Sequence, residues 1–110
     1  MDPNSRHWIE TRIRKQASER EISVTLHAHQ EMLEEDVSSA ELVASLRNCT
    51  LVENYPDHKR GACCLVCGQG DTGRMLHVVC TCEYPKLIII TVYEPKPPKW
   101  ETPFKRGMSA

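Results

Sequence analysis

The fold of this chain is decided by the stretch MLHVVCTCEYPKLIIITVY, residues 75–93. Two runs rich in apolar and β-branched residues, 75–83 and 87–93, are separated here by the short connection Tyr84-Pro85-Lys86. Such runs are typical of strands, and a short connection joins strands that pair antiparallel. The stretch therefore predicts a β-hairpin, and the isoleucine-rich second run is expected in the centre of the sheet.

Alternation along the hairpin predicts which side chains share a face. One apolar face of residues 75–83 consists of Leu76, Val78, Cys80 and Cys82, and the other face of Met75, His77, Val79 and Thr81. If the connection is a three-residue turn, Glu83 pairs with Leu87, and His77 pairs with Tyr93 on the same face. A change of one residue in the turn would reverse this arrangement. The pattern thus predicts an imidazole beside a phenol.

The remaining elements are read outward from this hairpin. Two strands are expected before it, at 51–55 and 60–67, with a glycine-rich loop at 68–73. Further upstream, the sequence predicts a helix to about residue 20, a short strand at 22–26, a helical segment at 27–35, and a helix that ends near residue 48. Ser38 and Glu41 have the spacing of a capping box at the start of that last helix. The order predicts an α+β fold with N-terminal helices packed on a mostly antiparallel four-stranded sheet.

The 110 residues are expected to form one domain, because two separate cores would each be too small. We divide it into an N-terminal helix at 1–20, an α+β core at 21–93 and an extended C-terminal tail at 94–110. Three prolines, Pro95, Pro97 and Pro98, oppose sheet pairing in this tail. Its anchors to the domain are expected to be Trp100 and Phe104.

The cellular location follows from two expected absences. Residues 1–10 are polar and lack the apolar segment of a signal peptide. The longest apolar run, residues 87–90, is far shorter than the roughly 20 residues of a membrane-spanning helix. We therefore expect a cytoplasmic protein without membrane contact.

Charge is distributed unevenly along a chain whose net charge is −1. Residues 21–58 hold eight acidic side chains against one basic side chain, Arg47, whereas residues 1–20 and 84–110 are weakly basic. This pattern is compatible with a polyanion partner at the basic parts, and equally with ordinary solvated faces. Aromatic residues make up only 5% of the chain, too few for a surface that binds nucleic acid mainly by stacking on bases.

Six cysteines leave two interpretations. The motif Cys64-Leu65-Val66-Cys67 has the spacing of a zinc knuckle, and with Cys80 and Cys82 it would supply four thiolates to a structural zinc ion. The two residues inside the motif, however, fit the interior of a strand, which favours cysteines as small core residues. We expect no metal and no cofactor on that interpretation, and a zinc-stabilised module is the alternative.

Histidine, arginine and tyrosine side chains are sufficient for RNA cleavage without a metal. One group accepts the proton of the 2′-hydroxyl, a cation stabilises the phosphate, and another group protonates the leaving oxygen. His27 lies at the start of a helical segment, His77 on a strand, and Arg60 follows Lys59 at the start of the expected strand 60–67. A single histidine is more often structural, as a helix cap or a partner of a carbonyl.

Basic and aromatic residues alternate in the C-terminal tail. With Lys59, the candidate nucleic-acid-binding residues are Lys96, Lys99, Trp100, Lys105 and Arg106. The same residues can instead fold back and cover the sheet edge, and the sequence leaves both alternatives open.

Several of these motifs together resemble a known family. They are His27-Ala28 with Met32 five residues on, the capped helix, Leu76-His77-Val78-Val79, Thr91-Val92-Tyr93-Glu94-Pro95 and the closing Lys99-Trp100. Over residues 22–106 they resemble the small bacterial family called domain of unknown function 4258. Its members are grouped with the RelE/BrnT-like toxin superfamily, compact domains with N-terminal helices on a mostly antiparallel sheet.

The resemblance implies a RelE-like toxin of a toxin-antitoxin system that cleaves RNA without a metal. Its partner would be a cognate antitoxin, a small zinc-finger or helix-turn-helix protein. Carried over residue by residue, the resemblance points to His27, His77 and Tyr93 as catalytic residues, with Arg60 on a flanking strand.

The chain also departs from the family, which usually has arginines at the positions of Glu31 and Glu35. Acidic residues there would weaken a contact with RNA. The alternative function is a non-catalytic protein-binding domain on the same fold, which would use the acidic residues of the 21–58 stretch.

Overall fold

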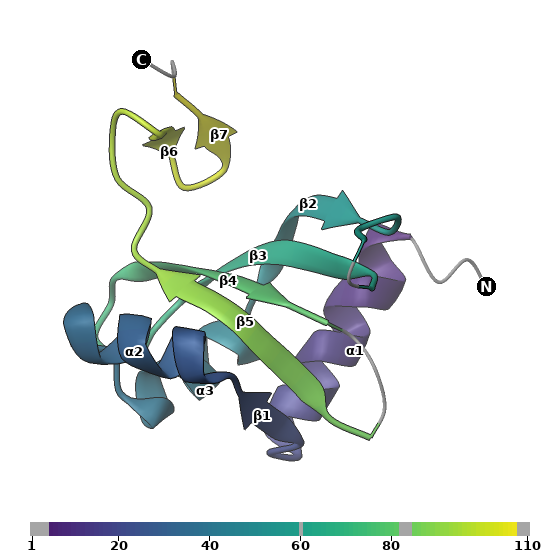
Figure 1. Cartoon of the computed structure of the whole chain (residues 1–110). Helices are drawn as coiled ribbons and strands as arrows, with labels where there is room; N and C mark the ends of the chain where they lie inside the picture. The colour runs from purple at the N-terminus through teal and green to yellow at the C-terminus, as the bar shows by residue number, and fades with distance from the viewer. Residues whose placement is uncertain (1–4, 60, 82–84, 108–110) are drawn as a thin grey trace.

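The computed structural model describes residues 5–59, 61–81 and 85–107, which form helices and strands in an α+β arrangement (Figure 1). The helices are α1 (Arg6–Ser18), α2 (Leu26–Glu34) and α3 (Ser39–Arg47). The strands are β1 (Ile22–Val24), β2 (Thr50–Tyr55), β3 (Cys63–Gln69), β4 (Met75–Cys80), β5 (Leu87–Tyr93), β6 (Trp100–Thr102) and β7 (Lys105–Arg106). The α+β class predicted from the sequence is confirmed.

The sheet has five strands in the order β1-β5-β4-β3-β2 and is mixed, not four-stranded. The pairs from β2 to β5 are antiparallel, as expected, but β1 pairs parallel with β5 at the sheet edge. β1 ends at Val24, earlier than predicted, because the Thr25 side chain accepts the first hydrogen bond of α2 from the Ala28 amide. The short strand expected at 22–26 is thus the fifth strand of the sheet.

The molecule has three layers (Figure 1). Helices α1 and α3 lie against one face of the sheet, which we call the inner face, and α2 runs beside β5. The small β6–β7 hairpin stands on the opposite side, which we call the outer face. The tail predicted to be extended therefore forms a hairpin of its own.

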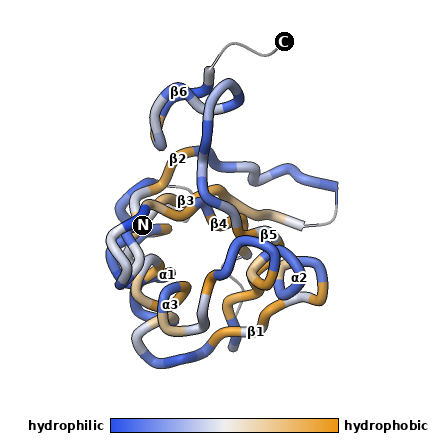
Figure 2. The backbone as a smooth tube through the Cα atoms, turned by 90° about the vertical axis from the view of Figure 1, so that its left-hand side faces the viewer, coloured by the Kyte–Doolittle hydropathy of each residue, from blue (hydrophilic) through white to orange (hydrophobic). Residues whose placement is uncertain are grey.

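The hydrophobic core lies between the inner face and the helices, where the apolar parts of the chain turn toward one another (Figure 2). Leu76, Val78 and Cys80 of β4 face this core, as alternation predicted, and pack with Ile13 and Leu46 of the helices. In the described part of the chain, no helix is both long enough and apolar enough to cross a membrane.

The register of the central hairpin brings His77 opposite Tyr93, as predicted. Cys80, in contrast, lies opposite Ile89 and Val79 lies opposite Thr91, so Ile90 is an extra residue in β5. The predicted pairing of Glu83 with Leu87 lies outside the described residues.

Side chains from the helical part of the chain form hydrogen bonds with backbone groups at both edges of the sheet. At the β2 edge, Glu10 accepts from the Leu51 amide at 2.7 Å, and Arg14 donates to the Cys49 carbonyl. Beyond the short strand β1, Glu31 accepts from the Val92 amide at 3.0 Å, and Glu35 accepts from the Glu94 amide at 2.9 Å. Such contacts block the addition of another strand at an otherwise open edge.

The predicted capping box is half formed. The Ser38 hydroxyl accepts from the Glu41 amide, but the Glu41 carboxylate turns away from the helix start. It accepts two hydrogen bonds of 2.8 Å from Arg74 and another from Thr72, in the loop between β3 and β4. This buried ion pair ties the loop to α3, and there is no room between them for a side chain at Gly70, because a Cβ there would lie 2.4 Å from Glu41 Cγ.

Candidate functional site

The C-terminal segment, residues 95–107, folds back over the outer face of the sheet. Its anchor is Trp100, which is only 2% exposed and whose ring lies edge-on to His77 at 4.4 Å between centroids. Phe104, the other expected anchor, is 51% exposed. The segment folds back, as one of the two alternatives left open by the sequence expects, but it covers a face of the sheet and not the edge.

His77 is completely buried beneath this segment. Its Nε2 lies 2.6 Å from the Pro103 carbonyl oxygen, and its Nδ1 lies 3.0 Å from the Tyr93 hydroxyl. A carbonyl only accepts hydrogen bonds, so Nε2 carries the proton and donates it to Pro103. In the neutral ring, Nδ1 therefore accepts from the Tyr93 hydroxyl. Both ring nitrogens are engaged while the segment is in place.

Burial shapes the acid–base behaviour of this pair. It lowers the pKa of His77, because the charged imidazolium loses its hydration, although the Pro103 carbonyl and the Glu53 charge oppose the change. Burial likewise raises the pKa of the Tyr93 phenol, against the influence of Trp100 and Arg106. The neutral forms of both groups are thus favoured in the covered state.

An ion pair holds the far end of the C-terminal segment to β2. Arg106 donates two hydrogen bonds of 2.7 Å to Glu53, whose carboxylate also accepts from the Tyr55 hydroxyl. The Arg106 hydrogen bonds lower the pKa of Glu53, and burial together with Glu53 raises the pKa of Tyr55 to about 12. The Arg106 guanidinium also lies 4.7 Å from the centre of the Trp100 ring. We call Glu53, Tyr55, His77, Tyr93 and Arg106 the outer-face cluster.

The cysteines do not gather as the zinc alternative requires. Cys64 faces the inner core, whereas Cys67, three positions on, pairs with His77 on the outer face. Among the residues that the structure describes, no three potential ligands lie close enough to share a metal ion, and Cys82 lies outside those residues. Burial raises the pKa of the Cys67 thiol to about 11, which makes it a poor nucleophile.

The predicted catalytic residues are only partly brought together. His77 and Tyr93 are in contact, but His27 lies on α2, exposed, with its Nε2 3.3 Å from Glu31. Arg60 lies outside the described residues.

The predicted nucleic-acid-binding residues have mixed environments. Lys59 and Lys96 are exposed, and the Lys99 ammonium lies 5.7 Å from the centre of the Tyr93 ring. Lys105 pairs with Glu101, and Arg106 pairs with Glu53. Trp100 is packed on His77, so it offers no free face to a base in this structure.

Sequence reasoning missed Glu53, Tyr55 and Pro103 as members of this region. Glu53 and Tyr55 alternate along β2, which signals that they share a face. Nothing local indicates that Arg106, 53 residues further along the chain, returns to meet Glu53.

These features define an α+β domain in which one face of the sheet carries a cluster of acid–base side chains beneath its own C-terminal segment. The chain belongs to the family described as Domain of unknown function (DUF4258), whose sequence pattern matches residues 24–94. No curated protein and no solved structure matches it significantly.

Proposed function

We propose that this chain is a RelE-like toxin-family protein that cleaves RNA without a metal, using the outer face of its sheet. The observation that supports this proposal is the His77–Tyr93 pair with Glu53 and Arg106 beside it. An acid–base group, a second proton-carrying group and a cation are what cleavage at a phosphodiester needs. The toxin superfamily and the antitoxin partner are parts of the same proposal and rest on the family resemblance.

The reaction is a transfer of the phosphodiester to its own ribose. The 2′-hydroxyl oxygen attacks phosphorus while a carboxylate such as Glu53 takes its proton. The bond from phosphorus to the 5′ oxygen breaks, and that oxygen takes a proton from Nε2 of a protonated His77. The products are a 2′,3′-cyclic phosphate and a 5′-hydroxyl, so no oxidant, reductant or metal is consumed.

Other residues would orient the reacting groups and stabilise charge. Tyr93 holds the His77 ring through Nδ1, which leaves Nε2 directed outward. Arg60, as the resemblance implies, or Arg106 would stabilise the negative charge of the phosphate. His27 is the alternative proton-transfer group that the resemblance offers.

Cleavage requires that the C-terminal segment first leaves the outer face, because Trp100 and Pro103 occupy the space next to His77. Movement of the segment would also release Arg106 from Glu53. The basic residues Lys96, Lys99, Lys105 and Arg106 would then be available to contact RNA phosphates.

A direct test is cleavage of a labelled RNA oligonucleotide by the purified full chain in the presence of a chelator. We expect Trp100→Ala to cleave roughly tenfold faster than the unaltered chain, because the uncovered state becomes more populated. His77→Asn in the Trp100→Ala background should abolish cleavage, and the product should carry a 2′,3′-cyclic phosphate. Induced expression in a bacterium should arrest growth and deplete messenger RNA.

Phe104→Ala is the matched control, since Phe104 lies in the same segment but is half exposed. It should cleave at the rate of the unaltered chain. The proposal fails if Trp100→Ala, shown to be folded by circular dichroism, leaves RNA intact, or if cleavage survives the His77→Asn change.

The second candidate is a non-catalytic binding domain. It is favoured by the full engagement of His77, whose two nitrogens serve Pro103 and Tyr93 as a structural lock would. A folded Trp100→Ala variant without ribonuclease activity would support this function instead.

A further inference from the structure

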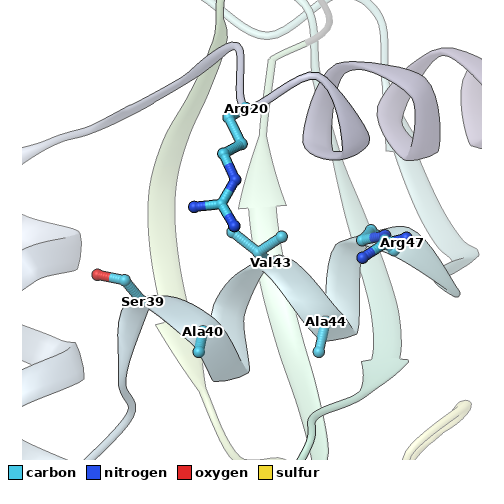
Figure 3. Close-up of a pocket in the computed structure, with 6 residues that line it drawn as sticks. All are labelled: Arg20, Ser39, Ala40, Val43, Ala44 and Arg47. Carbon is cyan, nitrogen blue, oxygen red and sulfur yellow. The ribbon is translucent and has the colours of Figure 1, made fainter.

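A groove runs along the outside of α3 (Figure 3). It consists of two adjoining hollows of about 300 and 190 Å³, which share the residues Arg20, Ser39 and Val43. The first hollow continues toward Arg47, and the second toward Val24 of β1. The groove therefore spans the space between α3 and the parallel edge strand.

The floor of the groove is made of small apolar side chains. Ala40, Val43 and Ala44 lie on one side of α3, away from the buried Leu46, and Arg47 continues this side toward the end of the helix. Small side chains on a helix allow the backbone of a second helix to come close. Val24, 39% exposed, extends this apolar surface at the sheet edge.

Two arginines lie over this floor. Figure 3 shows Arg20 reaching from beyond the end of α1 toward Val43, and Arg47 at the C-terminal end of α3. Neither guanidinium forms an ion pair with any residue that the structure describes. Among the described residues, other arginines pair with carboxylates, as Arg74 does with Glu41 and Arg106 with Glu53.

Arg20 occupies a backbone position that favours glycine. It follows the last turn of α1 with a φ of 58°, and the Glu21 amide closes the turn by donating to the Gln16 carbonyl. A side chain in this left-handed conformation costs about 1 kcal/mol relative to glycine. The position can therefore lose its guanidinium without loss of the turn, which makes it suitable for a test.

We propose that the groove between α3 and β1 binds an acidic amphipathic helix of a partner protein. Apolar side chains of that helix pack on Ala40, Val43 and Ala44, and its carboxylates reach Arg20 and Arg47. The unpaired positive charges at the groove select an acidic partner, and the apolar floor selects a protein helix over a phosphate chain, which would leave that floor in water. This surface is separate from the outer-face cluster, so it stands whether or not the chain cleaves RNA.

The probe is a synthetic amphipathic helix of about 16 residues, with leucines along one side and glutamates beside them, long enough to be helical. Titrated into the full chain, it should shift the methyl NMR signals of Ala40, Val43, Ala44 and Val24. Arg20→Gly and Arg47→Gln should each weaken its binding roughly tenfold. Arg20→Gly should do so with an unchanged or higher unfolding temperature.

Two controls make the test decisive. A peptide with lysines in place of the glutamates should not bind, and Lys59→Gln, in the loop after β2, should leave the affinity of the acidic peptide unchanged. The proposal is overturned if the acidic peptide leaves the groove signals unmoved, or if both peptides bind equally. It is also overturned if the two arginine changes abolish self-association of this chain or binding of an RNA oligonucleotide in place of peptide binding.

Discussion

Single carboxylates in the acidic stretch of this chain have partners inside the molecule. Glu31 accepts from the Val92 amide of β5, and Glu35 accepts from the Glu94 amide directly after that strand. Glu41 pairs with Arg74, and Glu53 pairs with Arg106. Arg74 and Arg106 therefore offset the charges of Glu41 and Glu53, whereas Glu31 and Glu35 keep their charge. In a protein-binding function, Glu31 and Glu35 would have to bind a partner while they also hold these backbone amides.

The Glu41–Arg74 pair makes stability depend on pH. The Arg74 hydrogen bonds lower the pKa of Glu41 from its usual 4.5, against the effect of burial. A lowered carboxyl pKa stabilises the fold above the unfolded-state value, and this contribution is lost as the pH falls through the lower folded-state value. We expect Glu41→Gln to reduce the free energy of unfolding by about 2–3 kcal/mol near neutral pH, and by much less near pH 3.

Urea unfolding of both chains at several pH values checks this expectation. Asp71→Asn, which removes an exposed charge from the same loop, should have almost no effect on stability. A Glu41→Gln deficit that stays constant down to pH 3 would show that the ion pair is not its cause.

At the scale of elements, one edge of β5 has different hydrogen-bonding partners along its length. Its first residues pair with β1. Beyond Ile89, the carboxylates of Glu31 and Glu35 accept hydrogen bonds from the backbone amides instead. Glu31 and Glu35 lie four residues apart on one side of α2, whereas Val92 and Glu94 lie two apart along the strand. The spacing of a helix thus matches the spacing of amides along one strand edge.

Removal of either carboxylate should expose this part of β5. We expect Glu31→Ala and Glu35→Ala each to lower the free energy of unfolding by about 1–2 kcal/mol, because a backbone amide loses its partner. Hydrogen exchange of the Val92 and Glu94 amides should accelerate in the respective variant. Glu34→Ala, on the exposed side of the same helix, should leave both amides protected.

Much of the element arrangement could be predicted, because the helix and strand patterns are local. The pairing of His77 with Tyr93 followed from a period of two and a short connection. The extra residue at Ile90 and the parallel partner of β5 could not be predicted, since neither leaves a local signal. The capping-box spacing of Ser38 and Glu41 correctly predicted the start of the helix. It did not predict the position of the Glu41 carboxylate, which binds Arg74 of another part of the chain.

At the scale of the whole molecule, the outer face is covered by contacts from the middle and the C-terminal end of residues 95–107. Trp100 and Pro103 cover His77, and Arg106 reaches Glu53. The covered state and the acid–base state of His77 are therefore coupled. The sequence could indicate the members of this cluster on the strands, but not the path of the segment that seals them.

The coupling predicts that acid weakens the cover. The pKa of His77 is lowered while the C-terminal segment covers it, so a proton binds more readily once the segment has left. The covered state is therefore stable above the ordinary histidine pKa of 6.5 and becomes less stable below it. Glu53 opposes this effect, and Arg106 and Lys99 reinforce it. Since Trp8 is the other tryptophan, Trp8→Phe leaves Trp100 as the reporter.

We expect the Trp100 emission of this variant to move to longer wavelengths as the pH falls from about 7.5 to about 5.5, with unchanged far-ultraviolet circular dichroism. Addition of His77→Asn should remove the pH dependence. Emission that does not change over this range would contradict the coupling.

The parallel pairing of β1 with β5 has a consequence for how the chain is made. Thr25 and Ile90, which are hydrogen-bonded next to this pairing, are 65 residues apart in the sequence. The antiparallel hairpins of β2 to β4 can close while a ribosome is still adding later residues, but β1 has no strand to join until β5 emerges. During synthesis, β1 and the helix α2 that follows it therefore gain their partner strand only when almost the last part of the sheet has emerged.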